Sequence, residues 1–598
     1  MRRGWWFTVA AGAAILVPAL PALGPAAQAG TALPAVPAGA RAIGPGGGRT
    51  GLAAGNPFCQ GLGKRYQASA GAQMFCFGEQ PTVGGQPSGG AGPGTAGVPR
   101  NVDAANPAED VSPAGARLYG QSETSVAAAG RYVVEAWNDS TSFASTCTAR
   151  DNKAEGTGLG FSADGGRSFT DLGGLPNPLC RKDVFEGDPA VAAYQVHGAT
   201  YFYISSLYDS RTGTGPSYIA FDACRASGSG SSARLRCHGP VIAASSKECF
   251  IPARSVSFCS FLDKDFIAID PARARLYVTY SEFPIFHQGN PEDLSACSLV
   301  RPAAPACETG TPLKLQGPAK QGRYVGKPYF TVASADRSRG CENEGSYPAV
   351  NVGTGALYVA YEYNWATNIL DPNCFGFRHQ TRDVIARIPK GCLTITPASP
   401  CAHPAGRAFV RVYSLDAAFL PGYNRFPAND FPRIAVSGRY GTVSMVWNDA
   451  RHHADGDALM ESFRLGSLAR VQPVPVTLDQ PHGGGMTFMP AVRMASGDGL
   501  LDVAWYSRAG TATASTNVMA AVGVSPLADR TPANVRITSA GSDWLIANSD
   551  ITPNFGDYID ASVSATGSWP YVGGTFYIAW SDGRSGVPQP YEAHLPAG

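Results

Sequence analysis

The strongest constraint on the fold is a short pattern that recurs seven times along the chain. Each copy joins a stretch with small residues to a second stretch that is almost continuously apolar or aromatic. The first copy is "ETSVAA" from Glu123 followed by "YVVEAWND" from Tyr132, and the last is "DYIDASV" from Asp557 followed by "TFYIAWSDGR" from Thr575. The copies begin at Glu123, Asp188, Asp265, Tyr347, Phe431, Met489 and Asp557. A repeat of this length that contains a pair of strands predicts a β-propeller with four-stranded blades.

Composition agrees with an all-β fold rich in turns. The 598 residues include 71 Gly and 47 Pro, and no long segment has apolar residues at helical spacing. We therefore expect an all-β, seven-bladed β-propeller, with a six-bladed ring as the fallback. A sandwich or several separate domains is the competing interpretation. The last repeat lacks a fourth strand, and "ARLYGQ" from Ala116 could supply it and close the ring.

The N-terminus has the pattern of a secretion signal. Arg2 and Arg3 precede an apolar run from Val9 to Leu20, and Ala27-Gln28-Ala29 is typical of a cleavage site. We divide the chain into a signal peptide (1–29), a flexible leader rich in Gly, Pro and Ala (30–115) and a propeller (116–598). An anchor helix is the alternative for the apolar run. We expect a secreted monomer without a membrane span, and a net charge of +1 argues against a nucleic-acid partner.

Cysteine usage fits export to an oxidising compartment. The chain has 14 cysteines and no C-x-x-C pair, so disulfides are favoured over a zinc site. They fall as near neighbours, which favours local bridges that hold loops within one unit. The pairs of neighbours are Cys59 and Cys76, Cys147 and Cys180, Cys224 and Cys237, Cys249 and Cys259, Cys297 and Cys307, Cys341 and Cys374, and Cys392 and Cys401.

The stretch "FSADGGRSF" predicts a tight turn between two strands of the first repeat. We expect Asp164 to accept backbone N–H bonds across the turn, Gly166 to adopt a positive φ and Phe169 to fill the space between strands. These are structural roles. The stretch matches the Asp-box pattern through Ser162, Asp164, Gly166, Ser168 and Phe169.

With this turn and the repeats, residues 120–598 resemble the secreted bacterial sialidase-like (BNR/Asp-box repeat) β-propeller family. Other stretches that carry the resemblance are "DKDFIAIDP" from Asp263, "FPRIAV…VWNDAR" from Phe431 and "NFGDYIDASV…YIAWSDGR" from Asn554. The family implies a glycan-directed propeller. Sialidases in it use three arginines, a Tyr with a Glu partner, and an Asp acid/base. Their first arginine motif is not found, because "ARIPKG" from Ala386 is mid-chain and Arg387 follows Ala.

Four acids lie at or near the start of the predicted inner strands. In a propeller, Glu123, Asp188, Asp265 and Asp557 would then meet at one mouth of the channel. Carboxylates at short range raise each other's pKa, as a general acid requires, so these four are the candidate catalytic residues. The same ring could hold Ca²⁺ through its oxygen atoms. The alternative is that each acid caps a turn.

A second set of polar residues follows or adjoins the repeats and is the candidate substrate-binding set. Carboxylates and arginines bind sugar hydroxyl and acid groups, and aromatic rings stack on sugars. The set comprises Tyr558, Arg451, Arg508, Arg584 and Glu362. The alternative is a structural role, with Asp–Arg pairs and capped turns.

Two classes of function remain open from the sequence. The first is a glycoside hydrolase that uses paired carboxylates at the channel mouth, whose separation sets retention or inversion. The second is a non-catalytic propeller that binds extracellular glycan or protein. A polysaccharide lyase is a weaker alternative.

Overall fold

The computed structural model describes most of the chain from residue 97 onward. The described residues are 97–111, 119–147, 152–250, 257–286, 289–316, 322–334, 342–365, 380–394, 403–413, 423, 431–453, 456–479, 486–495, 497–508, 515–545, 547, 549, 554–565 and 574–598. The chain divides into residues 1–45 and residues 46–598, and every feature below belongs to the second unit. The expected signal peptide and residues 30–96 of the expected leader lie outside the described residues.

The expected all-β class is confirmed. Regular structure in the described part of the chain consists of strands and three short 3₁₀ turns: η2 (Ser140–Ala144), η3 (Gly230–Ser232) and η5 (Lys390–Cys392). No described helix is long and apolar enough to cross a membrane.

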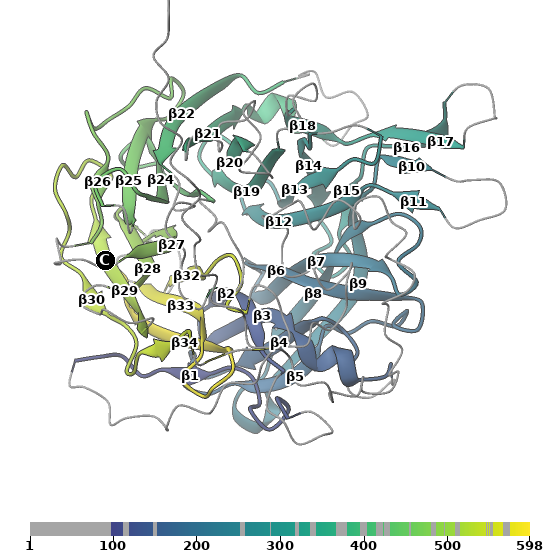
Figure 1. Ribbon diagram of the computed structural model, residues 1–598, viewed down its shortest axis with the longest axis horizontal. Helices are drawn as coiled ribbons and strands as arrows, with labels where there is room; N and C mark the ends of the chain where they lie inside the picture. Colours follow the sequence, from purple (N-terminus) through teal and green to yellow (C-terminus); the bar gives the residue numbers. More distant parts are fainter. Residues whose placement is uncertain are drawn as a thin grey trace, which may run out of the picture. The chain divides into compact units, whose positions relative to one another are not determined.

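Seven antiparallel sheets follow one another along the chain, and each contains one copy of the repeat (Figure 1). The first has β2 (Gln121–Ala129), β3 (Tyr132–Asp139), β4 (Thr157–Ser162) and β5 (Thr170–Gly174). The second has β6 (Asp183–Val196), β7 (Ala199–Ser210), β8 (Tyr218–Ser227) and β9 (Arg234–Ser245). The third has β12 (Phe261–Asp270), β13 (Arg275–Phe283), β14 (Glu292–Ser298), β15 (Ala306–Glu308) and β18 (Phe330–Ala333). The fourth has β19 (Glu342–Asn351), β20 (Ala356–Trp365), β21 (Gln380–Ile388) and β22 (Gly406–Tyr413).

The last three sheets have the same order of strands. The fifth has β23 (Arg433–Ser437), β24 (Thr442–Asp449), β25 (Asp457–Arg464) and β26 (Val476–Thr477). The sixth has β27 (Thr487–Met494), β28 (Leu501–Ser507), β29 (Ser515–Val524), β30 (Val535–Arg536) and β31 (Ser542–Asp543). The seventh has β32 (Asp560–Ala565), β33 (Gly574–Asp582), β34 (Gln589–Pro596) and β1 (Val102–Asp103).

An eighth sheet was not expected from the repeat. It contains β10 (Glu248–Phe250) and β11 (Phe258–Cys259), which precede the third sheet, and β16 (Thr311–Leu315) and β17 (Arg323–Lys327), which lie between β15 and β18 of that sheet. Its sequence carries no copy of the repeated pattern, so periodicity alone could not reveal it.

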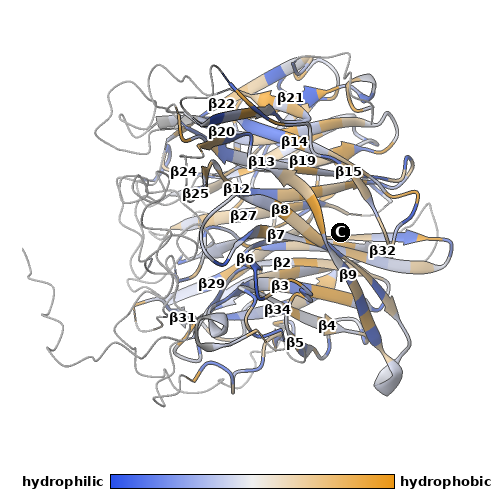
Figure 2. Ribbon diagram, turned by 90° about the vertical axis from the view of Figure 1, so that its right-hand side faces the viewer, coloured by the Kyte–Doolittle hydropathy of each residue, from blue (hydrophilic) through white to orange (hydrophobic). Residues whose placement is uncertain are grey.

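Neighbouring sheets pack through their faces in cyclic order. The first strands β2, β6, β12, β19, β23, β27 and β32 each contact the next, and β32 contacts β2 (Figure 1). Seven clusters of buried apolar side chains together join every consecutive pair of sheets, including the seventh sheet and the first. Figure 2 shows the hydrophobic residues concentrated along the strands. The second strands are apolar on both faces because a neighbouring sheet covers each face.

Tryptophans on the second strands are among the largest buried side chains. Trp137, Trp447, Trp505 and Trp580 lie on β3, β24, β28 and β33 and are at most 1% exposed. In the first sheet, Gly158 makes room for Trp137. A Cβ at this glycine would lie 2.1 Å from the indole Nε1. Packing of this density tolerates no added methyl group.

The seventh sheet is completed by a strand other than the expected one. The outermost strand is β1, in which Val102 pairs with Glu592 and Asp103 pairs with Tyr591. We expected the segment from Ala116 to supply this strand, and that prediction is wrong. Its described end, Tyr119 and Gly120, leads directly into β2 of the first sheet. β1 lies in the segment that we assigned to the leader. It has only two residues, Val102 and Asp103, so its sequence shows no strand periodicity.

The turn in "FSADGGRSF" has the hydrogen bonds expected of it. Asp164 Oδ1 accepts the Ser168 N–H at 3.0 Å and the Ser162 hydroxyl at 2.8 Å, and Gly166 has φ 83°. Phe169 packs against the apolar cluster that joins the first and seventh sheets. A Cβ at Gly166 would lie 2.9 Å from Glu592 Oε2 on β34, so the turn also seats against the last sheet.

Four disulfides in the described residues join the expected neighbours. They are Cys147–Cys180, Cys224–Cys237, Cys249–Cys259 and Cys297–Cys307. The last three link residues directly opposite each other on adjacent strands. The predicted neighbours Cys59 and Cys76, Cys341 and Cys374, and Cys401 lie outside the described residues.

We expect Gly158→Ala to destabilise the protein. The new methyl group must displace the Trp137 ring or the strand that faces it, which costs about 1–3 kcal/mol. Chemical denaturation measures the loss. Gly438→Ala is the matched control, because Gly438 is exposed and a Cβ there would meet no atom within 4 Å. Equal unfolding free energies for the two variants would contradict the packing described.

We expect Glu592→Gln to weaken the pH dependence of stability. Burial raises the pKa of Glu592 from 4.5 to about 7. The folded protein therefore holds this proton more tightly than the unfolded chain does. That stabilisation is complete below pH 4.5 and is lost as the pH rises through 7, by up to about 3 kcal/mol.

The measurement is unfolding free energy between pH 4.5 and 8 for wild type and variant. The neutral Gln side chain cannot titrate, so the variant gains stability relative to wild type as the pH rises. Glu109→Gln serves as the control, since Glu109 makes a surface ion pair with Lys153. Parallel pH profiles for Glu592→Gln and wild type would show that this carboxyl does not couple to folding.

Candidate functional site

The first strands share an irregularity near their beginnings. In five of them the pairing register with the second strand shifts at this point, which marks a β-bulge. The backbone there enters the left-handed region, with φ 53° at Glu123, 54° at Asp188 and 53° at Lys264. This conformation costs about 1 kcal/mol for a residue with a side chain, and such strain is concentrated at functional sites.

The bulge position corrects the alignment of the third repeat. Glu123 and Asp188 occupy it in the first two sheets, but Lys264 occupies it in the third, with Asp265 one residue later. In the seventh sheet, Gly556 has the positive φ (72°) and Asp557 follows it. Because adjacent residues of a strand point in different directions, a shift of one residue changes which side chain faces its neighbours.

Lys264 is the centre of a buried charge cluster. Its Nζ contacts Asp557 Oδ2 directly and lies 3.7 Å from Glu123 Oε1 and 3.8 Å from Asp188 Oδ2. The side chains of Lys264, Glu123, Asp188 and Asp557 are each 0 or 1% exposed. We call these four residues the Lys264 cluster. They come from the third, first, second and seventh sheets, so the cluster joins both ends of the repeat series.

Hydrogen bonds fix the carboxylates of this cluster. Asn138 Nδ2 donates to Glu123 Oε2 at 3.0 Å and to Asp188 Oδ1 at 3.4 Å. The Asp557 backbone N–H donates to Glu123 Oε1 at 3.1 Å. The Tyr423 hydroxyl donates to Asp557 Oδ1. These bonds hold the carboxyl groups within reach of one another and of a phenol.

The cluster changes the protonation of its members. Burial raises the pKa of Glu123 well above its ordinary value, and the neighbouring carboxyl of Asp188 raises it further against the opposing charge of Lys264. Burial alone would lower the pKa of Lys264, but Asp557, Glu123 and Asp188 together raise it above its ordinary value. The pKa of Glu123 therefore lies well above its ordinary value, and Lys264 stays a cation.

An arginine surrounded by aromatic rings adjoins the Lys264 cluster. The fully buried guanidinium of Arg433 lies 4.2 Å from the ring centroid of Phe266, 4.9 Å from that of Tyr347 and 5.3 Å from that of Tyr558. Lys264 Nζ lies 5.7 Å from the same Tyr558 ring. Burial lowers the pKa of Arg433 to about 10, so it remains charged at neutral pH. The aromatic faces stabilise both cations.

The structure unites three of the four predicted catalytic acids. Glu123, Asp188 and Asp557 belong to the Lys264 cluster, as their place at the start of the inner strands predicted. Asp265 makes no ion pair with Lys264 among the described contacts. Burial raises the pKa of Asp265 well above its ordinary value. Its assignment rested on the alignment that the bulge corrects.

Of the predicted substrate-binding residues, Tyr558 alone contacts the Lys264 cluster in the described part of the chain. Arg451 and Arg584 instead pair with Asp449 and Asp582 of their own sheets, at 2.7 and 2.6 Å. Each of these aspartates also accepts the indole N–H of a tryptophan two residues earlier, at 3.0 and 2.8 Å. The repeated "WNDAR" and "WSDGR" stretches thus form a structural corner.

The other two predicted residues of this set also lie within single sheets. Arg508 is buried, donates to Thr516 Oγ1 at 2.8 Å and lies 4.9 Å from the ring centroid of Trp544. Glu362 is buried on β20, where it pairs in register with Asp383 of β21. These placements agree with the structural alternative, and sugar recognition by either residue stays a prediction.

Sequence reasoning missed four residues of this region: Lys264, Asn138, Tyr423 and Arg433. The signal for Lys264 was available, because "DKDF" places it at the residue before the aligned acid. Tyr423 carried no signal, since it lies in no repeat. Arg433 sits in the fifth inner strand, where the alignment offered no acid to draw attention to it.

The acids of the predicted calcium site have a cation of the protein itself beside them, because Lys264 Nζ lies 3.7 Å from Glu123 Oε1 and 3.8 Å from Asp188 Oδ2. Elsewhere in the described residues, one group has ligand atoms close enough for a metal: Asp222, Cys224 and Cys237. The two cysteines form a disulfide, so their sulfur atoms are not available as thiolate ligands.

We expect Lys264→Met to destabilise the protein by about 3–5 kcal/mol, because it leaves buried carboxylates without a cation. Chemical denaturation checks this, with Lys314→Met as the control at an exposed lysine. Adding Asp557→Asn to Lys264→Met removes one of the uncompensated charges and is expected to restore part of the loss. A single variant as stable as wild type would mean that the ion pairs do not support the fold.

Comparison with known proteins gives distant structural likenesses. No family model and no curated protein matches the chain. A mutant of Trypanosoma rangeli sialidase with trans-sialidase activity matches at 9% identity and a TM-score of 0.33, over 70% of this chain and 58% of that chain. Phage phi92 endosialidase matches at 9% identity and 0.34, over 84% and 69%. The GH43 endo-arabinanase from Bacillus licheniformis matches at 13% identity and 0.25, over 59% and 97%. At TM-scores this low, the likeness assigns neither a family nor an activity.

Proposed function

We propose that the chain is a secreted, seven-bladed β-propeller. The cyclic contacts of the seven first strands and the seven clusters between sheets support this count. Strand β1 would then complete the last blade and leave no open sheet edge. The disulfides support folding in an oxidising compartment, as a secreted protein does.

We further propose that the propeller hydrolyses glycosidic bonds of an extracellular glycan at the Lys264 cluster. The observation that carries this proposal is that two carboxyl groups with different surroundings, Glu123 and Asp557, lie next to each other. Glu123 is held neutral by burial, whereas Asp557 is paired with a cation. Carboxyl groups whose surroundings separate their protonation states are the usual acid and base of glycoside hydrolysis.

The chemistry assigns one role to each group. The neutral Glu123 carboxyl gives its proton to the glycosidic oxygen as the C–O bond breaks. Asp557, the second carboxylate, stabilises or attacks the developing cation on the sugar, and water completes the hydrolysis. Both carboxylates contact Lys264 Nζ, which favours the short separation of about 5–5.5 Å that accompanies retention. Lys264 must move aside for the substrate, and Arg433 can then balance the charge.

A second candidate function is a propeller that binds glycan without cleaving it. The observation in its favour is that the side chains of the Lys264 cluster are 0 or 1% exposed, so a substrate has no open access to them. In that case Lys264 serves the fold by joining four sheets, and the strained backbone is maintained for stability.

The test is incubation of the purified chain with a glycan panel, with released reducing sugar and bound glycan measured in parallel. We expect wild type to release sugar from at least one glycan. Glu123→Gln should lower kcat by about 10²–10⁴-fold, because the amide cannot donate the acidic proton. Its unfolding free energy is measured alongside, because the amide keeps one of the two acceptor oxygens that bind the Asn138 side chain and the Asp557 backbone N–H.

Glu109→Gln, at a partly exposed surface carboxylate, is the matched control and should keep full activity. Binding without release, in wild type and both variants, would reject the hydrolase in favour of the binding protein. Release that is unaffected by Glu123→Gln would reject the role given to this residue.

A further inference from the structure

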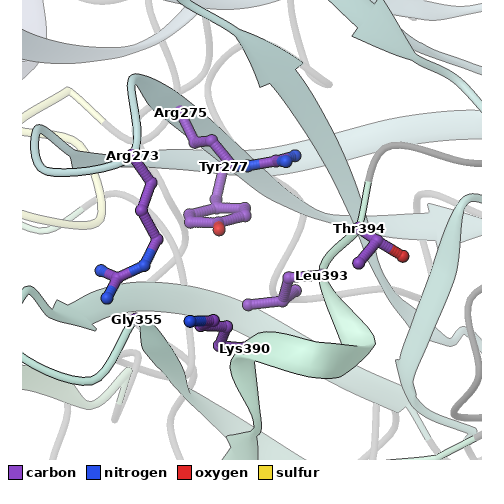
Figure 3. A pocket seen from close by; sticks show the side chains of 7 residues that line it. All are labelled: Arg273, Arg275, Tyr277, Gly355, Lys390, Leu393 and Thr394. Carbon is purple, nitrogen blue, oxygen red and sulfur yellow. The ribbon is translucent and has the colours of Figure 1, made fainter.

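A cavity lined by cations lies between the third and fourth sheets, away from the Lys264 cluster. Its volume is about 380 Å³, within the range of about 300–1,000 Å³ that is usual for small-molecule sites. The side chains that matter are Arg273, Arg275, Tyr277, Lys390 and Leu393 (Figure 3). They come from the β12–β13 turn, the start of β13 and the segment that follows β21.

This cavity is separate from the candidate catalytic centre. Lys264 lies near the beginning of β12, and Arg273 lies just after the end of the same strand. β12 ends at Asp270, six residues after Lys264, so at about 3.3 Å per residue the strand separates Lys264 from the β12–β13 turn by about 20 Å. A ligand in this cavity therefore cannot also touch Glu123 or Asp557.

Positive charge dominates the lining. Arg273 is paired with Asp270 at 2.9 Å and also donates to the Val352 carbonyl at 2.9 Å. Arg275 has a buried Nη1 that finds no hydrogen-bond acceptor among the described residues. Lys390 is exposed and has no ion pair within the described ranges. Besides Arg273, whose charge is paired with Asp270, the cavity is lined by two further cations, Arg275 and Lys390.

The wall is also held in place before any ligand binds. The Tyr329 hydroxyl donates to the Thr394 carbonyl, and the backbone of η5 is closed by bonds from Cys392 N to Pro389 O and from Leu393 N to Lys390 O. Cys392 is disulfide-bonded. A wall fixed in this way loses little conformational entropy on binding.

Two side chains of the cavity wall, Tyr277 and Leu393, favour an organic ligand over an inorganic ion. Figure 3 shows the Tyr277 ring beside the Arg273 side chain, with Lys390 and Leu393 below it in this view. Burial raises the pKa of Tyr277 to about 12, so its hydroxyl stays a neutral donor. The ring and the Leu393 side chain add apolar surface that an organic body can cover.

From these contacts we propose that the cavity binds a small organic oxyanion, a carboxylate-bearing molecule of about the size of a monosaccharide. Arg275 and Lys390 hold the carboxylate, because charged donors to a carboxylate make the strongest hydrogen bonds available to a side chain. Tyr277 and Leu393 face the rest of the molecule. The site is independent of hydrolysis at the Lys264 cluster.

The test is calorimetric titration of the full chain with D-glucuronate, D-glucose and inorganic sulfate at low salt. Glucuronate and glucose differ in the carboxylate, so we expect glucuronate alone of the two to bind. Arg275→Met and Lys390→Gln should each weaken glucuronate binding about tenfold or more. Added NaCl should weaken it further by screening the exposed charge of Lys390.

Arg530→Met, at an exposed arginine elsewhere, is the matched control and should bind as wild type does. Because Lys390 is exposed, its substitution tests the site even if Arg275→Met fails to fold. Glucose binding as tightly as glucuronate, or binding unchanged in Lys390→Gln, would overturn the proposal. Sulfate binding as tightly as glucuronate would mean that the cavity takes an ion without an organic body, which also overturns it.

Discussion

One buried ammonium group holds together the region on which this structure depends. Lys264 Nζ contacts or closely approaches carboxylates from three other sheets, and two of those sheets lie at opposite ends of the repeat series. Each buried ion loses hydration worth several kcal/mol, so such a cluster is stable only when charges and hydrogen bonds match. Asn138, Tyr423 and the Asp557 backbone N–H supply those bonds.

The backbone around this cluster explains why the charges meet. A bulge in the first strands gives Glu123, Asp188 and Lys264 the same left-handed conformation. The left-handed backbone at these three residues costs conformational free energy. It persists because contacts with neighbouring sheets hold each residue in this conformation. The same geometry serves either a catalytic acid or an ionic junction between sheets, and the protonation of Glu123 is the property that separates the two.

Much of the fold followed from the sequence, and part of the site did. The recurring small and apolar stretches identified the first two strands of all seven sheets, and cysteine spacing identified the four described disulfides. Glu123 and Asp188 were found because acids at equivalent positions of a repeat must come together when the repeats pack in cyclic order, and Asp557 was found although it lies one residue after the equivalent position, which Gly556 occupies. The extra sheet and strand β1 were not found, since neither has a repeated pattern.

The sequence by itself determined the strand content, the repeat boundaries and the local turns, because each depends on residues close together in the chain. Tertiary structure decided which charges pair. The bulge gives Lys264 the position that Glu123 and Asp188 hold in their own sheets, and its ammonium rather than the Asp265 carboxyl approaches the carboxylates. Tertiary structure also brings the Tyr423 hydroxyl to Asp557, a contact across 134 residues that no local sequence pattern encodes.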